Sequence, residues 1–535
     1  MYIEPNTTIK ILKNVPLDKT YKHTLFFESK TAQSNYFSSL TKYNLDNQTY
    51  QRVQKGIARV HYKAEDLYDC NYIMFQNTNF GSKWFYGFIT SVEYINNVVS
   101  EIRFELDVMQ TWYFDYNLKE CFVEREHSKT DKIGDNIISE PVSCGEYVYS
   151  GYSELTAMND MCVILAIVDV DKEIVDGELY DGIYGGAEMW AYKSTDVQSI
   201  NNKISSYISA PDSVVSIYMC PSILIPEIKD GGELLPYGAG GSSKYVSVDA
   251  ITENDKFGSY KPKNKKLYTY PYNYFNLDNG SGSSLPLRYE FFDDLKPVIA
   301  IKGVITQPVK VVARPCSYKG IKGYNEVSGY TSLKTESITL ESYPMCSWNT
   351  NAYASWVAQN SVPLALNTIS SVAGIASSMA TTNIVASLSA HPNAVEQMGD
   401  INVGTNLISN IAGTLSSVYS ASISADICRG TMNNGGANVA NGEQQFYKSR
   451  VHITEQFAKM VDDFFTMFGY ATNRVKIPNI SNRPHWNYIK TNGCTAIGSI
   501  PSDDMRSICS IYDSGITFWK NGDEIGNYSL DNSPK

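Results

Sequence analysis

The feature that most constrains this chain is a long stretch almost without charge. Between residues 342 and 424 only Glu396 and Asp400 are ionised, and residues 335–428 contain no lysine or arginine. The chain as a whole has 19% charged residues, as folded proteins of this length do, and a surface segment of this size normally carries several of them. We therefore expect the stretch to be covered, either by protein or by a membrane.

Two uncharged runs, Ser361–Ala390 and Ile401–Ala425, make up most of this stretch, and a joint rich in turn residues separates them. At about 1.5 Å per residue, a helix of roughly 25–30 residues is long enough to cross a hydrocarbon core of about 30 Å. Small residues spaced three or four apart also let helices approach closely in a bilayer. Serine, threonine and asparagine weaken insertion, so the pattern predicts a helical hairpin that enters a membrane only conditionally.

The candidate site consists of the apolar residues that recur through this hairpin and would form its plugging or membrane-inserting faces. They are Leu364, Leu366, Ile369, Val372, Ile375, Met379, Ile384, Val385, Leu388, Ile401, Leu407, Ile408, Ile411, Leu415, Val418, Tyr419 and Ile423. From composition alone, a hairpin buried in a protein–protein interface fits equally well. A flexible linker fits poorly, because apolar residues recur too regularly.

The rest of the chain predicts a mainly β (α+β) protein, with antiparallel barrel or sandwich domains. Two sets of residues alternate as in a half-buried strand, with Ile102, Phe104, Leu106 and Val108 on one face and Arg103, Glu105 and Asp107 on the other. The run 161–171 is typical of a fully buried strand. One amphipathic helix is expected after Thr454, with an apolar stripe that includes Met460. The expected parts are a first β domain (1–145), an inserted mixed region (146–265), the first part of a second β domain (266–345), the uncharged loop with its Gly/Asn linker (346–442) and the C-terminal part of the second β domain (443–535).

Charge and cysteine usage exclude several kinds of protein. A net charge of −11 argues against a surface that grips phosphate, which needs clustered lysine and arginine. The ten cysteines are scattered singly, so we expect free thiols made in a reducing compartment rather than a disulfide framework or a zinc site. The N-terminal residues show neither a basic nor an apolar signal region, so no secretory signal is expected.

A search for catalytic patterns finds none, and we expect neither an enzyme nor a cofactor. Glu124 and Glu126 form a carboxylate pair in the sequence, but strand periodicity predicts that both lie on one solvated face. Asp462 and Asp463 are expected to face solvent on the amphipathic helix. The lysine-rich run at 261–266 is expected to be a solvated loop.

Several stretches resemble one family, the distal tail-tube or tail-knob proteins of small short-tailed Picovirinae-type phages of Gram-positive bacteria. They are YIMFQNTNFGSKWFYGFIT (72–90), FELDVMQTW (104–112), FVEREH (122–127), YTYPY (268–272), FFTMFGYATNRVKIPN (464–479), GITFW (515–519) and IGNYSL (525–530). These stretches follow the family's order, whereas 146–265 matches poorly. The segment 361–426 falls where the family has a long apolar loop, but it is richer in Ser, Thr and Asn than the Gly/Met-rich loops of the family.

The resemblance implies a homohexameric tube in the virion tail, assembled in the host cytoplasm, through which phage DNA passes without sequence-specific binding. It also implies that the apolar loop plugs the tube and then inserts in the host cytoplasmic membrane as a pore for genome ejection. Its implied partners are further copies of the chain, a proximal tail or lower-collar protein and tail-tip proteins. In the alternative interpretation, the loop is only a plug or assembly contact and another protein penetrates the membrane.

Overall fold

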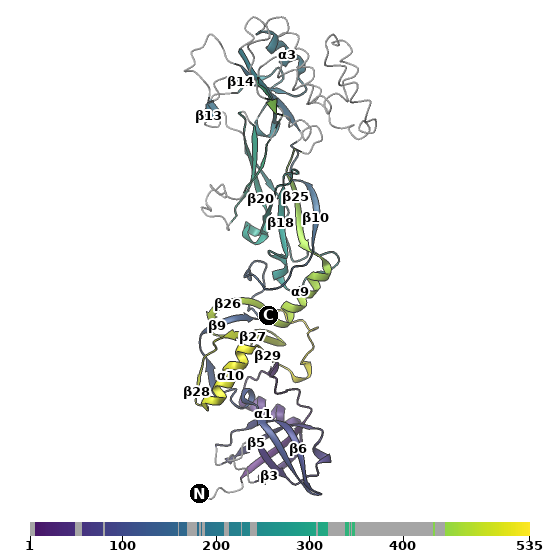
Figure 1. Cartoon of the computed structure of the whole chain (residues 1–535), viewed down its shortest axis with the longest axis vertical. Helices are drawn as coiled ribbons and strands as arrows, with labels where there is room; N and C mark the ends of the chain where they lie inside the picture. The colour runs from purple at the N-terminus through teal and green to yellow at the C-terminus, as the bar shows by residue number, and fades with distance from the viewer. Residues whose placement is uncertain are drawn as a thin grey trace. The chain divides into compact units, whose positions relative to one another are not determined.

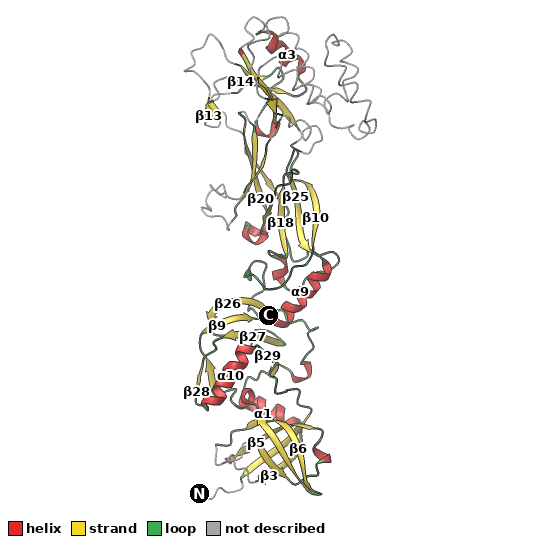
Figure 2. Ribbon diagram, in the orientation of Figure 1, coloured by secondary structure: helices red, strands yellow, loops and turns green. Residues whose placement is uncertain are grey.

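The structure, a computed structural model, is dominated by antiparallel β-sheets, which confirms the predicted fold class (Figure 2). It forms two compact units, each built from separate stretches of chain: unit 1 from 1–146, 253–272 and 453–535, and unit 2 from 147–252 and 273–452. The residues that it describes are 6–48, 56–78, 81–158, 160–167, 179–180, 183–184, 188–207, 213–225, 227–235, 243–306, 309–318, 337–341, 343, 345–347, 432–433 and 444–534.

Unit 1 begins with a six-stranded antiparallel sheet (Figure 1). Its order is β3 (Thr41–Gln48), β1 (Thr7–Lys13), β5 (Cys70–Asn77), β6 (Phe85–Asn96), β7 (Val99–Leu106) and β4 (Ile57–Val60). In β7 the predicted alternation is confirmed for Ile102 and Phe104, which are buried, and for Arg103, which is exposed. It is wrong beyond Leu106, because the strand ends there and Asp107 is buried as the N-cap of a short helix that begins at Val108. Helix α1 (Lys30–Ser39), capped by the side chain of Ser29, adds the buried ring of Phe37 to the core.

The second sheet of unit 1 joins the two ends of the chain. Its order is β2 (His23–Leu25), β29 (Ile516–Trp519), β27 (Trp486–Asn492), β9 (Cys121–Glu126) and β26 (Tyr470–Lys476). Only the β2–β29 pair is parallel. A short ladder joins β8 (Tyr116–Leu118) to β28 (Ala496–Gly498), and the helices are α2 (Val108–Thr111), α9 (Glu455–Phe468) and α10 (Ser502–Ser514), which lies against β27.

The sequence-based prediction assigns 443–535 to the same β domain as 266–345, and the structure differs from it because of this strand pairing. In the structure, 453–535 packs with 1–146, because β27 and β29 hydrogen-bond to strands near the N-terminus. The rings of Trp486 and Trp519, both fully buried, lie 5.0 Å apart in the core that the two ends share. Strand pairing over such a distance in sequence leaves no local pattern.

A cluster of buried charged groups connects the three stretches of chain that make up unit 1. The carboxylate of Glu140 is fully buried, forms ion pairs with Arg125 and Lys266, and accepts a 2.8 Å hydrogen bond from the backbone N–H of Ala471. The expectation that all of 261–266 is a solvated loop is therefore wrong for Lys266, which is 3% exposed. Its ammonium is buried because it neutralises a buried carboxylate.

Helix α9 lies where the sequence predicts it, with Thr454 at its N-cap. The predicted exposure is confirmed for Asp463 but wrong for Asp462, which is fully buried. The carboxylate of Asp462 accepts hydrogen bonds from the backbone N–H groups of Lys263 and Asn264, at 2.7 and 2.9 Å. Met460, expected in the apolar stripe, is 59% exposed because this side of the helix faces outward.

The two carboxylates of β9, those of Glu124 and Glu126, differ in their exposure to solvent. Glu124 is half-exposed and forms a 2.7 Å ion pair with Lys490. Glu126, expected on the same solvated face, is buried and forms an ion pair with Lys476. The difference arises because the pairing of β9 with β27 shifts register after Lys490, which breaks the simple alternation of a strand.

Unit 2 contains three larger sheets. The first has the order β10 (Tyr147–Glu154), β25 (Tyr447–Ile453), β18 (Asn273–Asp278) and β19 (Ser284–Leu287), and contains the hairpin predicted around the Asp-Asn-Gly turn. The second has β17 (Lys244–Ser247), β20 (Val298–Val304), β21 (Lys310–Cys316) and β22 (Ile338–Leu340). The third has β16 (Glu233–Leu234), β14 (Glu188–Lys193), β11 (Met161–Ile167), β15 (Val214–Pro221), β23 (Met345–Ser347) and β24 (Met432–Asn433). The described part of the unit also contains helix α3 (Val197–Ser205) and a small hairpin of β12 (Leu179–Tyr180) and β13 (Ile183–Tyr184).

Candidate functional site

In unit 2, a strand at the start of the uncharged stretch is paired with a strand that follows its end. Strand β23 runs antiparallel to β24, with Met345 opposite Asn433 and Cys346 opposite Met432. Strand β23 is also antiparallel to β15, on its other side. The chain therefore leaves this sheet at one strand and returns at its neighbour. We call the three strands β15, β23 and β24 the loop base.

The loop base is anchored on a strand that is buried along its whole length. All seven residues of β11, MCVILAI, are buried, and β11 pairs with β15 from Met161 to Ile167. A continuous apolar run without alternation is typical of a strand covered on both faces. This confirms the buried strand predicted at 161–171 for the part that the structure describes.

Two further hydrogen bonds hold the chain just outside the β23–β24 pair. The side-chain amide of Gln444 donates a hydrogen bond to the backbone carbonyl of Glu341. The amide of Gln445 donates to the carboxylate of Glu154 at 2.7 Å. Gln444 and Gln445 are both buried, so these bonds replace water that the amides lose on folding. The chain before the stretch and the chain after it are thus joined twice, by the β23–β24 pair and by the hydrogen bond from Gln444 to Glu341.

A phenol and a thiol near the loop base, those of Tyr343 and Cys220, are held in their neutral forms. Burial raises the pKa of the Tyr343 phenol above its ordinary value. A hydrogen bond with Cys162, together with burial, raises the pKa of the Cys220 thiol. The phenol of Tyr218 donates a 2.7 Å hydrogen bond to the carbonyl of Ile305. In these neutral forms the phenol of Tyr343 and the thiol of Cys220 are poor nucleophiles.

The described residues offer little elsewhere for catalysis. Among them, no group of three or more histidine, cysteine or acidic side chains is arranged to hold a metal ion. A depression of about 300 Å³ in unit 1 is lined in part by Asp115, whose carboxylate is neutralised by ion pairs with Lys30 and Lys83. The lysine hydrogen bonds lower the pKa of Asp115 against the opposing effect of burial, so it stays ionised.

The predicted plug or membrane residues, from Leu364 to Ile423, all lie outside the described residues. The structure thus fixes where the uncharged stretch begins and ends. In the part of the chain that the structure describes, no helix combines the length and apolar character needed to cross a membrane.

Sequence reasoning missed the loop base itself. Its strands β23 and β24 are only three and two residues long, too short for an alternation pattern to stand out. The only available signal is the abrupt loss of charge after 341, which marks the position of the loop but not the pairing of its ends.

Comparison with known proteins adds two family matches and several relatives. Residues 241–533 match the family described as the C-terminal domain of the tail knob protein gp9 of Bacillus phage phi29, and residues 5–117 match the N-terminus of caudoviral major tail proteins. The chain is 28% identical to the tail knob protein gp9 of Bacillus phage PZA and 26% identical to that of Bacillus phage phi29. Each alignment covers 98% of both chains.

A solved structure shares the fold. The tail knob protein gp12 of bacteriophage C1 superposes with a TM-score of 0.62 over 98% of this chain and 99% of its own, at 15% sequence identity. At that identity the match concerns the fold alone. It extends over both units, including the region 146–265 that the sequence motifs leave unmatched.

Proposed function

The chain belongs to the tail knob family represented by gp9 of Bacillus phage phi29, and on this premise we propose that copies of it form the distal tube through which phage DNA leaves the tail. It is a component of the virion tail. Its relatives are structural tail proteins, in agreement with the expectation that it is not an enzyme. The tube is a homohexamer, assembled in the host cytoplasm between a proximal tail or lower-collar protein and tail-tip proteins.

Charge and fold support the conducting role. Each subunit has a net charge of −11, and a ring of subunits concentrates this charge around its axis. An acidic lining repels the phosphate backbone, so that DNA passes without being held. Antiparallel sheets with covered cores supply a wall stiff enough for this passage. In the proposed tube, the domains at 1–145, 266–345 and 443–535 form the wall.

The loop base is the single observation that best supports a separate role for the uncharged stretch. Because its ends are hydrogen-bonded to each other, the stretch at 348–431 can change its surroundings without pulling on the sheet. We assign it the plug of the tube before infection and a pore in the host cytoplasmic membrane afterwards. The apolar residues from Leu364 to Ile423 then meet protein in the first state and lipid in the second.

The alternative function keeps the tube and the plug but leaves penetration of the membrane to another protein. The Ser-, Thr- and Asn-rich composition of the stretch favours it, because each of these residues lowers the gain from entering lipid. The two functions differ in one measurable property, which is release of the contents of closed vesicles.

Purified full-length protein, added to dye-filled anionic liposomes across a range of pH, tests the membrane role. The proposed pore releases the dye, and a variant in which 347–431 is replaced by Asn-Gly does not. Binding without release at every pH, with the variant behaving like the wild type, would establish the alternative. Electron microscopy of the same samples reports whether both proteins form rings, and so separates loss of the loop from loss of assembly.

A further inference from the structure

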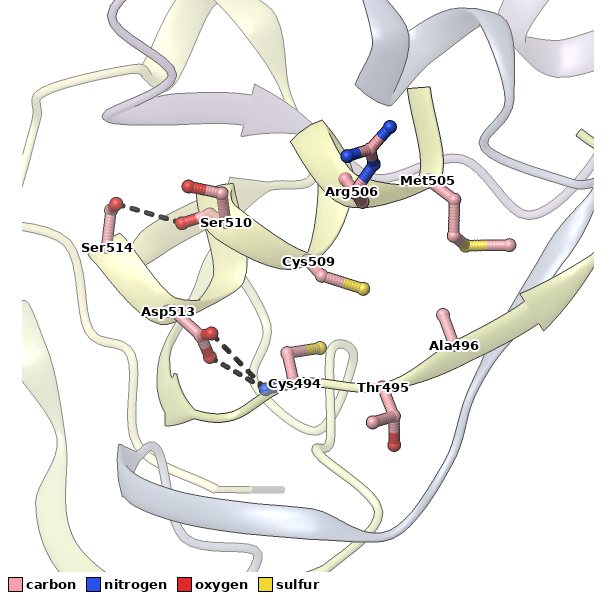
Figure 3. A pocket seen from close by; sticks show the side chains of 9 residues that line it. All are labelled: Cys494, Thr495, Ala496, Met505, Arg506, Cys509, Ser510, Asp513 and Ser514. Carbon is pink, nitrogen blue, oxygen red and sulfur yellow. Dashed lines mark hydrogen bonds between the residues drawn. The ribbon is translucent and has the colours of Figure 1, made fainter. Parts of the chain in front are cut away.

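Three cysteine side chains meet beside a surface depression of about 530 Å³ in unit 1. The thiol of Cys494 is in hydrogen-bonding contact with those of Cys509 and Cys121. Cys494 and Cys509 both line the depression, and Figure 3 shows their side chains between α10 and the segment that leads into β28. Cys121 opens β9 beneath them. Adjacent thiols are a place where a covalent bond can form.

The positions of two of these thiols are fixed by a single helix. The carboxylate of Asp513 accepts a 3.0 Å hydrogen bond from the backbone N–H of Cys494 (Figure 3). It also accepts a 2.7 Å hydrogen bond from the hydroxyl of Thr491. Asp513 and Cys509 lie four residues apart on α10, and therefore on the same face of the helix. The helix that carries one thiol thus also holds the backbone of the other in place.

Access differs among the three sulfur atoms. Cys509 is half-buried at the depression, whereas Cys494 is 8% and Cys121 5% exposed. A small oxidant in solvent therefore reaches Cys509 first. Cys494 is the neighbour placed to complete a bond, since it contacts Cys509 and lines the same depression.

We propose that Cys494 and Cys509 form a disulfide after the virion leaves the reducing cytoplasm, and that this bond fastens α10 to the turn that follows β27. The oxidant is a small disulfide such as oxidised glutathione. The Cys509 thiolate attacks one of its sulfur atoms and releases one thiol, and the Cys494 thiolate then displaces the second. One disulfide forms in the protein and one breaks in the oxidant, while the two protons pass to the released thiolates.

The surroundings make this reaction slow rather than immediate. Burial raises the pKa of both thiols, which keeps the fraction of reactive thiolate small near neutral pH. The protein is therefore assembled with reduced thiols and acquires the bond over a longer period outside the cell, where disulfides persist.

A second pair of cysteines provides a control within the same chain. Cys162 and Cys220 lie opposite each other on β11 and β15, and their thiols also interact. Both are fully buried in unit 2, so no oxidant reaches them in the folded protein. Proximity alone would oxidise both pairs, whereas the proposed mechanism oxidises only the pair at the surface.

Peptide mapping of the native full-length protein tests the proposal. After incubation with oxidised glutathione, remaining thiols are alkylated in denaturant and the protein is digested with trypsin without reduction. Cleavage after Lys490, Arg506 and Lys520 places Cys494 in 491–506 and Cys509 in 507–520. We expect these two peptides to be linked, and Cys162 and Cys220 to be alkylated.

Thermal unfolding gives the second measurement. The linked protein should melt roughly 5–10 °C above the reduced protein, as expected for closing a loop of this size, and dithiothreitol should abolish the difference. Cys509→Ser should show neither the link nor the shift. Recovery of 491–506 and 507–520 unlinked, of glutathione retained on Cys509, or of 491–506 linked instead to 120–125 would overturn the proposal, and none of these readings depends on a variant folding.

Discussion

The phenol of Tyr260 donates a 2.6 Å hydrogen bond to the carboxylate of Asp462, and so joins the segment that enters unit 1 at 253 to helix α9. Asp462 is fully buried, and two backbone N–H groups and the amide of Asn264 donate to the same carboxylate. Burial, with a contribution from this carboxylate, raises the pKa of the Tyr260 phenol. The pair thus stays in the form in which the phenol donates.

Replacing Asp462 by alanine should destabilise unit 1 strongly. Several donors held against this buried carboxylate would lose their acceptor at once, at about 1–3 kcal/mol for each that water cannot reach, so we expect a loss of roughly 3–5 kcal/mol. The exposed neighbour Asp463 supplies the matched control, for which alanine should change the free energy of unfolding by less than about 0.5 kcal/mol. Urea denaturation of both variants measures the difference, and equal midpoints would refute this role for Asp462.

Removing the charge of Glu140 should be equally costly. Glutamine at this position leaves the ammonium of Lys266 and the guanidinium of Arg125 buried without their counter-ion, and breaking a buried pair in this way costs about 3–5 kcal/mol. Burial lowers the pKa of Lys266, and Glu140 opposes this shift. The double variant Glu140→Gln, Lys266→Met should therefore regain part of the loss, as measured in a double-mutant cycle. Simple additivity of the two changes would contradict the ion pair.

Whether the sequence predicts a residue's environment depends on how far away in the sequence its partners lie. Periodicity predicts the buried strand at 161–167 and the helix after Thr454, because both depend on neighbouring residues. It gives the wrong environment for Asp462 and Lys266, since their partners lie far away in the sequence. A lone acidic residue on a helix resembles any solvated residue until its donors are known.

The candidate site divides in the same way. Loss of charge locates the uncharged stretch, and the family motifs add its position in the chain. The pairing of Cys346 with Met432 could not be predicted, because strands this short have no pattern of their own. Helices α1 and α10 were also not singled out, and their buried residues, Phe37 and Ile508 among them, are too few to give a clear helical period.

The pH dependence of stability should depend on His127. Its ring accepts a 2.8 Å hydrogen bond from the backbone N–H of Tyr488 at Nδ1, while Nε2 lies 3.1 Å from the carbonyl of Thr466, to which it donates. This arrangement requires a neutral ring. Burial, with repulsion from nearby arginines, accordingly lowers the pKa of His127 from 6.5 to about 3.

Acid should therefore destabilise the fold through this residue. Between pH 6.5 and about 3 the unfolded chain binds a proton at His127 that the folded protein does not, so stability falls by up to about 1.4 kcal/mol per pH unit as the pH decreases. His127→Gln should flatten this slope in denaturation curves recorded from pH 7 to 4. The same change at the exposed His61 should leave the slope as it is. Identical slopes for all three proteins would exclude His127 as the cause.

The loop base should allow the uncharged stretch to be removed without loss of the fold. Strands β23 and β24 are antiparallel neighbours, and a two-residue Asn-Gly turn suits such a connection. With 347–431 replaced in this way, so that Cys346 stays opposite Met432, the melting temperature should stay within about 3 °C of the wild type, because the buried sheet is retained and the closing loop becomes shorter. Aggregation of the shortened chain, or loss of strand signal in circular dichroism, would show that the stretch is needed to fold unit 2.

A single charge introduced into the uncharged stretch should distinguish its two proposed functions, insertion in a membrane and plugging of the tube alone. Val385 lies within the first apolar run, five residues before its end, and a lysine carried into the bilayer there would cost up to about 2.5–3.5 kcal/mol, the figure for the helix centre. We expect Val385→Lys to assemble as the wild type does but to release dye from liposomes at least ten times more slowly. Val98→Lys, which adds the same charge at a half-exposed position of unit 1, should release dye at the wild-type rate. If Val385→Lys also releases dye at that rate, Val385 does not meet lipid, and the loop acts at this position only as a plug.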